Sequence, residues 1–296
     1  NGGSTVFWDV ATFGLIRERS HHLVFGEFSS KFAKVALNAP HLESPSVIEC
    51  ETGSVPPLLR PDSSIDTCAF PQNETSTGVA CPVIRPPGDS LVLVDATSAA
   101  GGVRFDANAT DVYYFAPQKC FGGDGGLWIA TCSPRAIRRI EQIAASGRWM
   151  PPSLSLPLAL ENSRANQTYN TPALVTLFLL AEQVEWMLEQ GGLEWAAGRC
   201  DQSAATLYGW AEASDFASPY VRDPGSRSTV TGTIDFVDSV DAAEIAKVLR
   251  NNGILDTEPY RKLGRNQLRI AMFPSIEPSD VEALTACVEY VVEALA

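Results

Sequence analysis

The sequence predicts an α/β protein, with a large domain built on a mainly parallel sheet flanked by helices and a small C-terminal α+β domain. Two observations indicate this class. Apolar runs of strand length alternate with segments of helical period up to about residue 145, and strands and helices are mixed again after residue 213. The chain has 296 residues, of which 45% are hydrophobic and 19% charged, so it is long enough to bury both cores.

The first half of the chain contains the elements of the large domain. Apolar runs rich in β-branched and aromatic residues predict strands at 22–25, near 47, and at 65–70, 91–94, 112–115 and 126–131. Segments with a 3.6-residue period predict helices at about 6–15, 28–37 and 134–145. Because these strands alternate with helices, we expect a parallel sheet.

Two long helices, at 173–188 and 193–213, are predicted on either side of Gly191 and Gly192. We place the domain boundary at this joint, so that the large domain spans residues 1–192 and the small domain residues 193–296. In the small domain, strands are predicted at 230–236, 254–256 and 267–273, and helices at 242–251 and 279–295.

The composition excludes several classes of partner. The net charge of −13 and the pI near 4.7 leave no basic stripe for a nucleic acid or an anionic membrane. No apolar segment reaches the roughly 18 residues of a membrane span. The seven cysteines lack CxxC spacing, which predicts neither a disulfide framework nor a metal site. We expect a soluble, cytoplasmic protein that acts on small molecules.

Two strand ends carry residues that indicate a chemistry. Asp95 follows the apolar run 91–94, and Lys119 comes shortly after the run 112–115. The carboxyl ends of parallel strands share one edge of a sheet, where open α/β sheets bind ligands. An amine and a buried carboxylate suit pyridoxal phosphate, because the amine can form a Schiff base with the aldehyde while the carboxylate keeps the pyridine nitrogen protonated.

Each of these residues also has a simpler interpretation. An aspartate at a strand end is often only the N-cap of a helix, and a lysine after Pro117 and Gln118 is often a solvated side chain. The order and the shared edge of the sheet favour the cofactor.

Other residues at strand ends and at a helix start fit the same ligand. Phe28 could stack on a pyridine ring and Thr75 could reach its polar edge, although core packing explains Phe28 equally well. Gly3 and Ser4 precede an apolar helix, and the first amides of a helix can cradle a phosphate or simply form an N-cap.

Eight segments, in order along the whole chain, carry a resemblance to a known family. They are GGSTVFWD (2–9), FGEFSSKF (25–32), NETSTG (73–78), VDATSAAGG (94–102), YYFAPQKCF (113–121), DGGLW (124–128), NQTYNTP (166–172) and EPYRKLGRNQLRIAMFP (258–274). The chain resembles the phosphoserine aminotransferases, class-V enzymes of fold type I, and in particular their actinobacterial branch. The resemblance implies a fold-type I transferase that depends on pyridoxal phosphate and whose large domain has a seven-stranded sheet.

The resemblance also implies roles for individual residues. Lys119 is the Schiff-base lysine, Asp95 the partner of the pyridine nitrogen and Phe28 the stacking aromatic. Further contacts to the cofactor are assigned to Thr75 and Gln118, and contacts to its phosphate to Gly3, Ser4 and Thr5. Asn170 and Thr171 would reach the phosphate held by a neighbouring subunit, which makes the active site a property of a homodimer.

The substrate is expected to meet arginine and lysine side chains near the C-terminal end. By the resemblance, Arg269 grips the substrate α-carboxylate, because a guanidinium can pair with a carboxylate through two hydrogen bonds. Arg261, Lys262 and Arg265 stand where relatives carry a His-Arg pair for the second anionic group. A solvated basic turn is the alternative interpretation of these three residues.

The implied reaction is phosphoserine transamination, from L-glutamate and 3-phosphohydroxypyruvate to 2-oxoglutarate and O-phospho-L-serine, with the phosphohydroxythreonine step of vitamin B6 synthesis as a second use. One alternative is another class-V activity, such as alanine–glyoxylate transamination. Cysteine desulfuration is disfavoured because Gln118 occupies the place of a histidine. A second alternative is an inactive cofactor-binding fragment, since relatives carry several tens of residues before the first motif.

Overall fold

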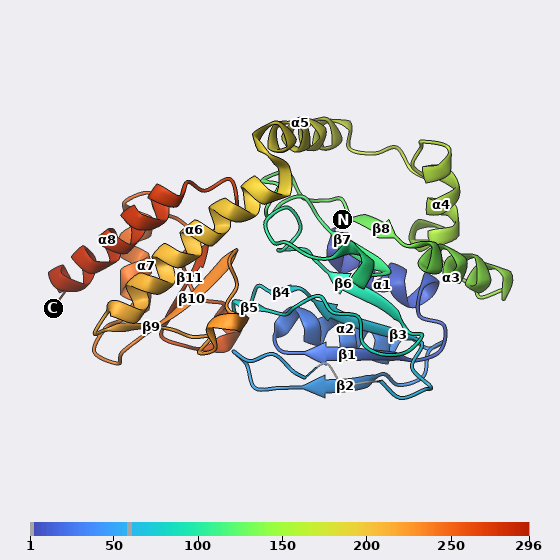
Figure 1. The fold of residues 1–296 in the computed structure, drawn as a ribbon, viewed down its shortest axis with the longest axis horizontal. Helices are drawn as coiled ribbons and strands as arrows, with labels where there is room; N and C mark the ends of the chain where they lie inside the picture. The colour runs from blue at the N-terminus through green and yellow to red at the C-terminus, as the bar shows by residue number, and fades with distance from the viewer. Residues whose placement is uncertain (1–2, 58–60, 296) are drawn as a thin grey trace.

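The main sheet is confirmed as mainly parallel. The computed structural model describes residues 3–57 and 61–295 of the chain (Figure 1). Within these residues the strands pair in the order β2-β1-β3-β6-β7-β8, and only β8 runs antiparallel to its neighbour. Their bounds are β1 (Ser20–Val24), β2 (Ser46–Glu49), β3 (Thr67–Pro71), β6 (Leu91–Asp95), β7 (Val112–Phe115) and β8 (Ile129–Cys132).

The seven strands implied by the family resemblance are not found among the described residues. The sheet consists of the six strands that the apolar runs predicted, and β2 and β8 form its two edges. The last strand begins at Ile129 rather than at Gly126, because Gly126 adopts a φ of 89°, which does not fit a strand.

Alternate residues of the strands face two different layers. Leu91 and Leu93 of β6 pack under the helices α1 (Ser4–Gly14), α2 (Glu27–Asn38) and α3 (Pro134–Ala145). Val92 and Val94 face the opposite layer, formed by the hairpin of β4 (Asn73–Glu74) and β5 (Val79–Ala80) and by the turns that follow β6. Because both faces are covered, β1, β3 and β6 are buried along their whole length, which explains the continuous apolar run Leu91–Val94 of β6.

Three helices follow the main sheet, namely α4 (Leu156–Arg164), α5 (Leu174–Gln190) and α6 (Gly192–Ala213). The helix α4 was not predicted from the sequence, because it has only nine residues and carries a proline in its first turn. At the joint of α5 and α6, Gly191 and Gly192 have φ angles of 122° and 65°, which glycine adopts at little cost. Between residues 3–57 and 61–295, no helix combines the length and the apolar character needed to span a membrane.

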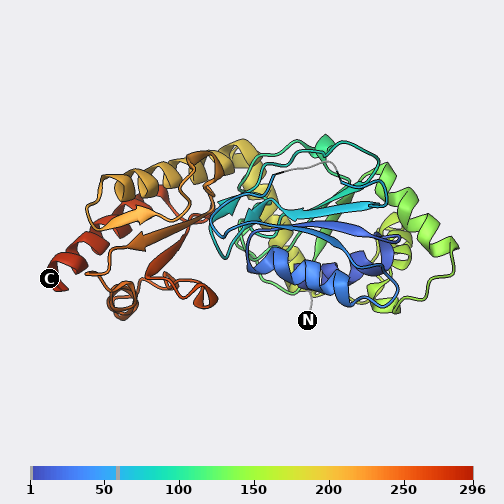
Figure 2. The same ribbon diagram turned by 90° about the horizontal axis from the view of Figure 1, so that it is seen from below.

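A second, antiparallel sheet has the order β11-β10-β9, with β9 (Ala217–Pro219), β10 (Thr231–Phe236) and β11 (Gln267–Ala271). It packs with α6, α7 (Ala242–Asn251) and α8 (Pro278–Leu295) around one core, and Figure 2 shows it beside the main sheet. Short 3₁₀ helices lie at Ala107–Ala109, Pro152–Leu154, Pro224–Ser226 and Arg261–Leu263.

The strand predicted at 254–256 is wrong. Asp256 has a φ of 63° there and pairs with Arg250, so the chain turns instead of extending.

The buried carboxylate of Asp66 fixes the entrance to β1. It accepts hydrogen bonds from the backbone amides of Arg17, Glu18 and Arg19 at 3.0, 2.7 and 2.8 Å, and from Nη1 of Arg139 on α3 at 2.7 Å. Burial alone would raise the pKa of Asp66, but these backbone donors outweigh it and hold the pKa below its ordinary value. The carboxylate therefore joins the α1–β1 turn to α3.

We expect Asp66→Asn to lower the free energy of unfolding by about 3 kcal/mol at pH 7, because removing one partner of a buried ion pair leaves the other uncompensated. Since the folded-state pKa of Asp66 is depressed, its stabilisation is present above the unfolded-state pKa and is lost as the pH falls through the folded-state value. Urea unfolding of parent and variant at pH 7 and pH 3 measures this. The exposed Asp62→Asn change is the control, and a difference between parent and Asp66→Asn that is the same at both pH values would contradict the assignment.

Candidate active site

Asp95 ends β6 at the carboxyl edge of the sheet and is buried. Its Oδ1 accepts hydrogen bonds from the amide of Thr97 at 2.9 Å and from the Thr97 hydroxyl, and its Oδ2 accepts one from Nε1 of Trp8 at 3.0 Å. Burial raises the pKa of Asp95, while the Thr97 and Trp8 donors act in the opposite direction. The structure thus provides a buried carboxylate, as the sequence predicted, with no ion pair to a cation among the described residues.

Lys119 lies in the turn after β7, at the same edge of the sheet. The turn is closed by a hydrogen bond from the amide of Gly122 to the Lys119 carbonyl oxygen at 2.9 Å, and Nζ of Lys119 lies 5.9 Å from the ring centre of Phe273. Burial, and then the charge of Arg269, lower the pKa of the Lys119 amine. A lowered pKa increases the share of the neutral, nucleophilic amine. Gln118, beside it, is exposed.

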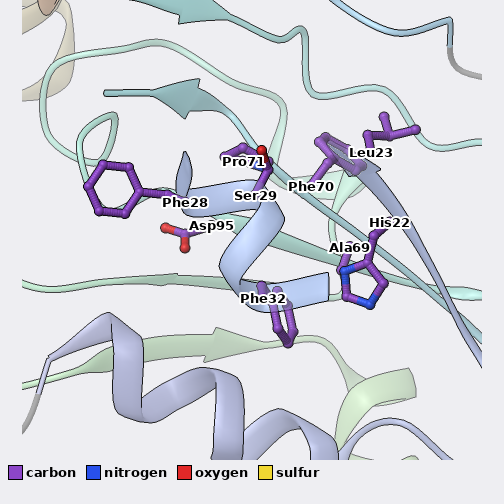
Figure 3. Close-up of a pocket in the computed structure, with 9 residues that line it drawn as sticks. All are labelled: His22, Leu23, Phe28, Ser29, Phe32, Ala69, Phe70, Pro71 and Asp95. Carbon is purple, nitrogen blue, oxygen red and sulfur yellow. The ribbon is translucent and has the colours of Figure 1, made fainter. Parts of the chain in front are cut away.

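A small cavity opens between α2 and the ends of the strands. Phe28 and Asp95 both line it, and Figure 3 shows them at one end with His22 toward the other. Burial lowers the pKa of His22 to about 3, so this ring is neutral near pH 7. The predicted stacking aromatic and the predicted partner of the ring nitrogen therefore border the same cavity.

Glu74 fixes the position of Phe28. Its buried carboxylate accepts hydrogen bonds from the amides of Phe28 and Ser29 at 3.3 and 2.9 Å and from the hydroxyls of Ser29 and Ser76 at 2.8 and 2.7 Å. Gly26, which precedes α2, is needed because an added Cβ would lie 2.3 Å from Cγ of Glu74. The role of Glu74 was not predicted, although the residue belongs to the motif at 73–78. Its partner Phe28 lies 46 positions earlier at the start of α2, and such a distant contact leaves no local pattern in the sequence.

Arg269 reaches the same region from β11. Its Nη1 donates to the carbonyl oxygen of Thr75 at 3.4 Å, and its guanidinium lies 5.5 Å from the ring centre of Tyr260. Tyr260 in turn lies 6.0 Å from Phe28, so it stands between the predicted stacking and carboxylate-binding residues. The Thr75 hydroxyl donates to Ser98 at 2.7 Å. Tyr260 was missed by the sequence analysis, although it belongs to the motif at 258–274.

The three basic residues near Arg269 differ in their surroundings. Lys262 forms an ion pair with Glu27 at the start of α2, and Arg265 forms one with Asp235 of β10. Arg261 is exposed in the 3₁₀ turn Arg261–Leu263, directly before Lys262. Two of the three cations thus have a carboxylate partner within the chain, and Lys262 contacts α2 at Glu27, the residue before Phe28.

The start of α1 is suited to an anion. Gly3 has a φ of 92° and precedes the helix, and the Ser4 hydroxyl is buried without a hydrogen-bond partner in the described part of the chain. Thr5 is exposed. An unpartnered buried hydroxyl beside free helix amides is a site that a phosphate oxygen would satisfy. Together with Asp95 and Lys119, it fits the phosphate, ring nitrogen and aldehyde of pyridoxal phosphate.

Asn170 and Thr171 are not brought to the other site residues within one chain. They are exposed in the connection between α4 and α5, which Figure 1 shows away from the carboxyl edge of the sheet. The groove that they line is formed by residues of their own loop, together with Ser163 of α4 and Leu177 of α5.

Comparison with known proteins identifies relatives of the whole chain. The family model described as aminotransferase class-V matches residues 53–257. A phosphoserine aminotransferase of a Nocardioides species is 60% identical over 299 residues, covering 100% of this chain and 80% of that protein. The crystal structure of a phosphoserine aminotransferase from Cytophaga hutchinsonii superposes with a TM-score of 0.90 at 25% identity, covering 98% of this chain and 81% of that one. A phosphoserine aminotransferase from Bacillus circulans, with a TM-score of 0.85 at 20% identity over 100% of this chain and 80% of that one, shares the fold.

Proposed function

The chain belongs to the class-V aminotransferases, and we propose that it catalyses phosphoserine transamination with pyridoxal phosphate as its cofactor. In this reaction L-glutamate and 3-phosphohydroxypyruvate give 2-oxoglutarate and O-phospho-L-serine, reversibly. The observation that carries the proposal is the placement of Asp95, Lys119 and Arg269 around one edge of the sheet. The whole-chain similarity to a named phosphoserine aminotransferase gives the substrate class.

The cofactor, when bound, supplies an electron sink for the carbon that loses its proton. Asp95 would hold the proton on the ring nitrogen, because a buried carboxylate favours a cation beside it. Lys119 would hold the aldehyde carbon before substrate enters, and its freed Nζ would then move the proton at the substrate Cα. Its lowered pKa suits both tasks, since a neutral amine is required for each.

The remaining residues of the chain would orient the cofactor. Phe28 would cover one face of the ring, and Thr75 and Gln118 would contact its polar groups. Gly3, Ser4 and Thr5 would hold the phosphate at the start of α1, where the buried Ser4 hydroxyl lacks a partner among the described residues.

Arg269 would bind the α-carboxylate that all amino-acid substrates share. Burial lowers the pKa of Arg269, with the neighbouring Tyr260 acting in the opposite direction, but an arginine keeps its charge in proteins. We assign the second anionic group of the substrate to the Arg261, Lys262 and Arg265 cluster. Of these, Lys262 is the best placed, since its partner Glu27 adjoins Phe28.

We propose that the protein is a homodimer and that α5 lies at its interface. Large apolar side chains of α5 are exposed, including Leu174 at 75%, Val175 at 68% and Phe178 at 59%. A contiguous apolar face of this kind is typical of an interaction site. Asn170 and Thr171 lie directly before α5, where they could reach the cofactor phosphate of the partner subunit.

Three further assignments belong to this proposal. The domain boundary is placed at Gly191–Gly192, which is supported by a separate core formed by residues between 204 and 291. The protein is assigned to the cytoplasm, which fits its seven free cysteines. The phosphohydroxythreonine step of vitamin B6 synthesis is proposed as a second reaction.

The two alternatives are less favoured, given the 60% identity to a phosphoserine aminotransferase. These alternatives are alanine–glyoxylate transamination and an inactive cofactor-binding fragment.

Lys119→Ala should abolish covalent cofactor attachment and amino transfer, because we assign no other amine to this edge of the sheet. Borohydride reduction followed by mass spectrometry of tryptic peptides measures the attachment, and a coupled 2-oxoglutarate assay measures the transfer. Lys247→Ala, on the exposed surface of α7, is the control. A reducible adduct that persists in Lys119→Ala would remove Lys119 from its role.

Arg269→Ala should reduce kcat/KM for every amino-acid substrate, whereas Lys262→Ala should act chiefly on phosphohydroxypyruvate. Loss of a charge-assisted contact costs on the order of 1.5–3 kcal/mol, which corresponds to about ten- to a hundred-fold in affinity. The measurement compares phosphohydroxypyruvate with hydroxypyruvate for the single alanine variants of Arg261, Lys262 and Arg265. Equal losses toward both acceptors, or no losses, would show that the cluster does not read the phosphate.

Phe178→Asp should convert the dimer to monomers and weaken cofactor binding, because it puts a charge into the proposed apolar interface. Analytical ultracentrifugation and equilibrium dialysis of pyridoxal phosphate measure the two effects. Tyr290→Asp, which replaces a side chain of α8 that is 73% exposed, should leave both unchanged. If Phe178→Asp remains a dimer with parental cofactor affinity, α5 is not the interface.

A further inference from the structure

The indole of Trp8 is buried against the carboxylate of Asp95. Trp8 is 3% exposed, and its Nε1 donates to Oδ2 of Asp95 at 3.0 Å across 87 positions of the chain. The ring is held in place by Phe32 of α2, which stacks on it with ring centres 6.0 Å apart and planes inclined by 11°. Packing against Phe32 therefore restricts the orientation of the indole and, with it, the direction of the N–H.

Trp8 and Thr97 donate to different oxygens of Asp95. Thr97 supplies its amide and its hydroxyl to Oδ1, and Trp8 donates to Oδ2. The buried Tyr114 phenol also acts to lower the pKa of Asp95. An indole N–H can only donate, whereas a hydroxyl can also accept. The Trp8 contact is consequently lost if the proton of a neutral Asp95 occupies the same lone pair, and it favours the ionised carboxylate.

Within the described residues, the titratable side chains of β1 and β7 beside Asp95 carry no balancing charge. His22 of β1 lines the same cavity and has a pKa of about 3 because of burial and the adjacent His21, so it is neutral. Tyr113 and Tyr114 of β7 are buried as well, which raises their pKa values and keeps both phenols neutral. In the absence of a cationic cofactor ring, the ionised Asp95 carboxylate is therefore stabilised by hydrogen bonds.

Trp8 also connects two parts of the cofactor site through one helix. Ser4 and Trp8 are separated by four positions of α1, so they lie on the same face with a rise of about 6 Å between them. The helix start offers the Ser4 hydroxyl, which has no hydrogen-bond partner among residues 3–57 and 61–295, and the next turn offers the indole donor. One rigid element thus sets the phosphate cradle and the ring-nitrogen partner relative to each other.

We propose that Trp8 is a positioning residue that keeps the Asp95 carboxylate ionised and aimed at the ring nitrogen of pyridoxal phosphate. The inference rests on the proposed function, because it requires that the protein bind this cofactor. It predicts that Trp8 contributes to cofactor affinity through Asp95 and not through general packing of α1.

The test compares cofactor affinity in Trp8→Phe, Asp95→Asn and the double variant, with Val10→Ala as a matched loss of buried volume from the same helix. The dissociation constant of pyridoxal phosphate is measured with the apoprotein between pH 5.5 and 8.5, and thermal unfolding of each apoprotein is recorded. We expect Trp8→Phe to bind about tenfold more weakly at pH 7.5, as for the loss of one hydrogen bond to a charged group. The loss of affinity relative to the parent should grow as the pH falls. Without the indole donor, the Asp95 carboxylate takes up its proton at a higher pH than it does in the parent.

In the Asp95→Asn background, Trp8→Phe should change the dissociation constant by less than about twofold, since the amide at position 95 carries no negative charge for the indole donor to stabilise. Val10→Ala should lower the unfolding temperature but bind cofactor as the parent does. An equal loss of affinity from Trp8→Phe in both backgrounds, or in Val10→Ala, would overturn the inference. Parent protein that binds no pyridoxal phosphate would overturn the proposed function as well.

If Trp8→Phe does not fold, the same comparison uses a benzothienyl analogue of tryptophan at position 8, in which sulfur replaces the ring N–H and the shape is kept. The analogue should reproduce the affinity deficit and its pH dependence. Parental affinity in the analogue would show that the indole N–H has no such role.

Discussion

Five hydrogen bonds converge on the buried carboxylate of Glu74 and join the start of α2 to the turn at residues 73–78. Desolvation of a carboxylate costs several kcal/mol, and each hydrogen bond to a charged group returns roughly 1.5–3 kcal/mol. The positive end of the helix dipole adds up to about 2 kcal/mol in a buried setting. The hydrogen bonds offset the desolvation cost of Glu74 only while all the donors stay in place. The position of Phe28, whose amide is one of these donors, is therefore fixed. The site is rigid at this point because a charge is buried there.

Ser98 extends the same constraint to the other strand ends. Its hydroxyl receives hydrogen bonds from Asn73 and Thr75 at 2.8 and 2.7 Å, and its carbonyl oxygen receives one from the thiol of Cys120 at 3.3 Å. The turns after β3, β6 and β7 are therefore connected directly to one another, and the last of them carries Lys119. Parallel strands bring their carboxyl ends to one edge of the sheet, but the turns that follow could still adopt different conformations. The hydrogen bonds of Ser98 join these turns and restrict their conformations.

The sequence predicted those parts of the molecule whose cause is local. Buried strands such as 91–94 are continuous apolar runs because both faces of the sheet are covered, and Asp95 follows from its place at the end of one of them. A two-residue strand such as Asn73–Glu74 is polar and too short to show an alternation of apolar and polar residues. It is recognised as a strand only by its hydrogen bonds with β5. The contact of Trp8 with Asp95 spans 87 positions and depends on how α1 packs on the sheet. Such a contact leaves no pattern along the chain, even where both residues belong to segments that the family resemblance identifies.

The turn at 73–78 also determines where Arg269 stands relative to Lys119. The Thr233 hydroxyl of β10 donates to the carbonyl oxygen of Thr77 at 2.8 Å, and the amide of Ser228 donates to that of Gly78 at 3.0 Å. A Cβ at Gly78 would lie 2.7 Å from Oγ1 of Thr233, so the second sheet approaches the turn as closely as a glycine permits. Arg269 is paired with Thr233 across β10 and β11 and donates to Thr75 in the same turn. Arg269 of the second sheet and Phe28 of α2 are thus positioned by the same turn at residues 73–78, since each is hydrogen-bonded to it.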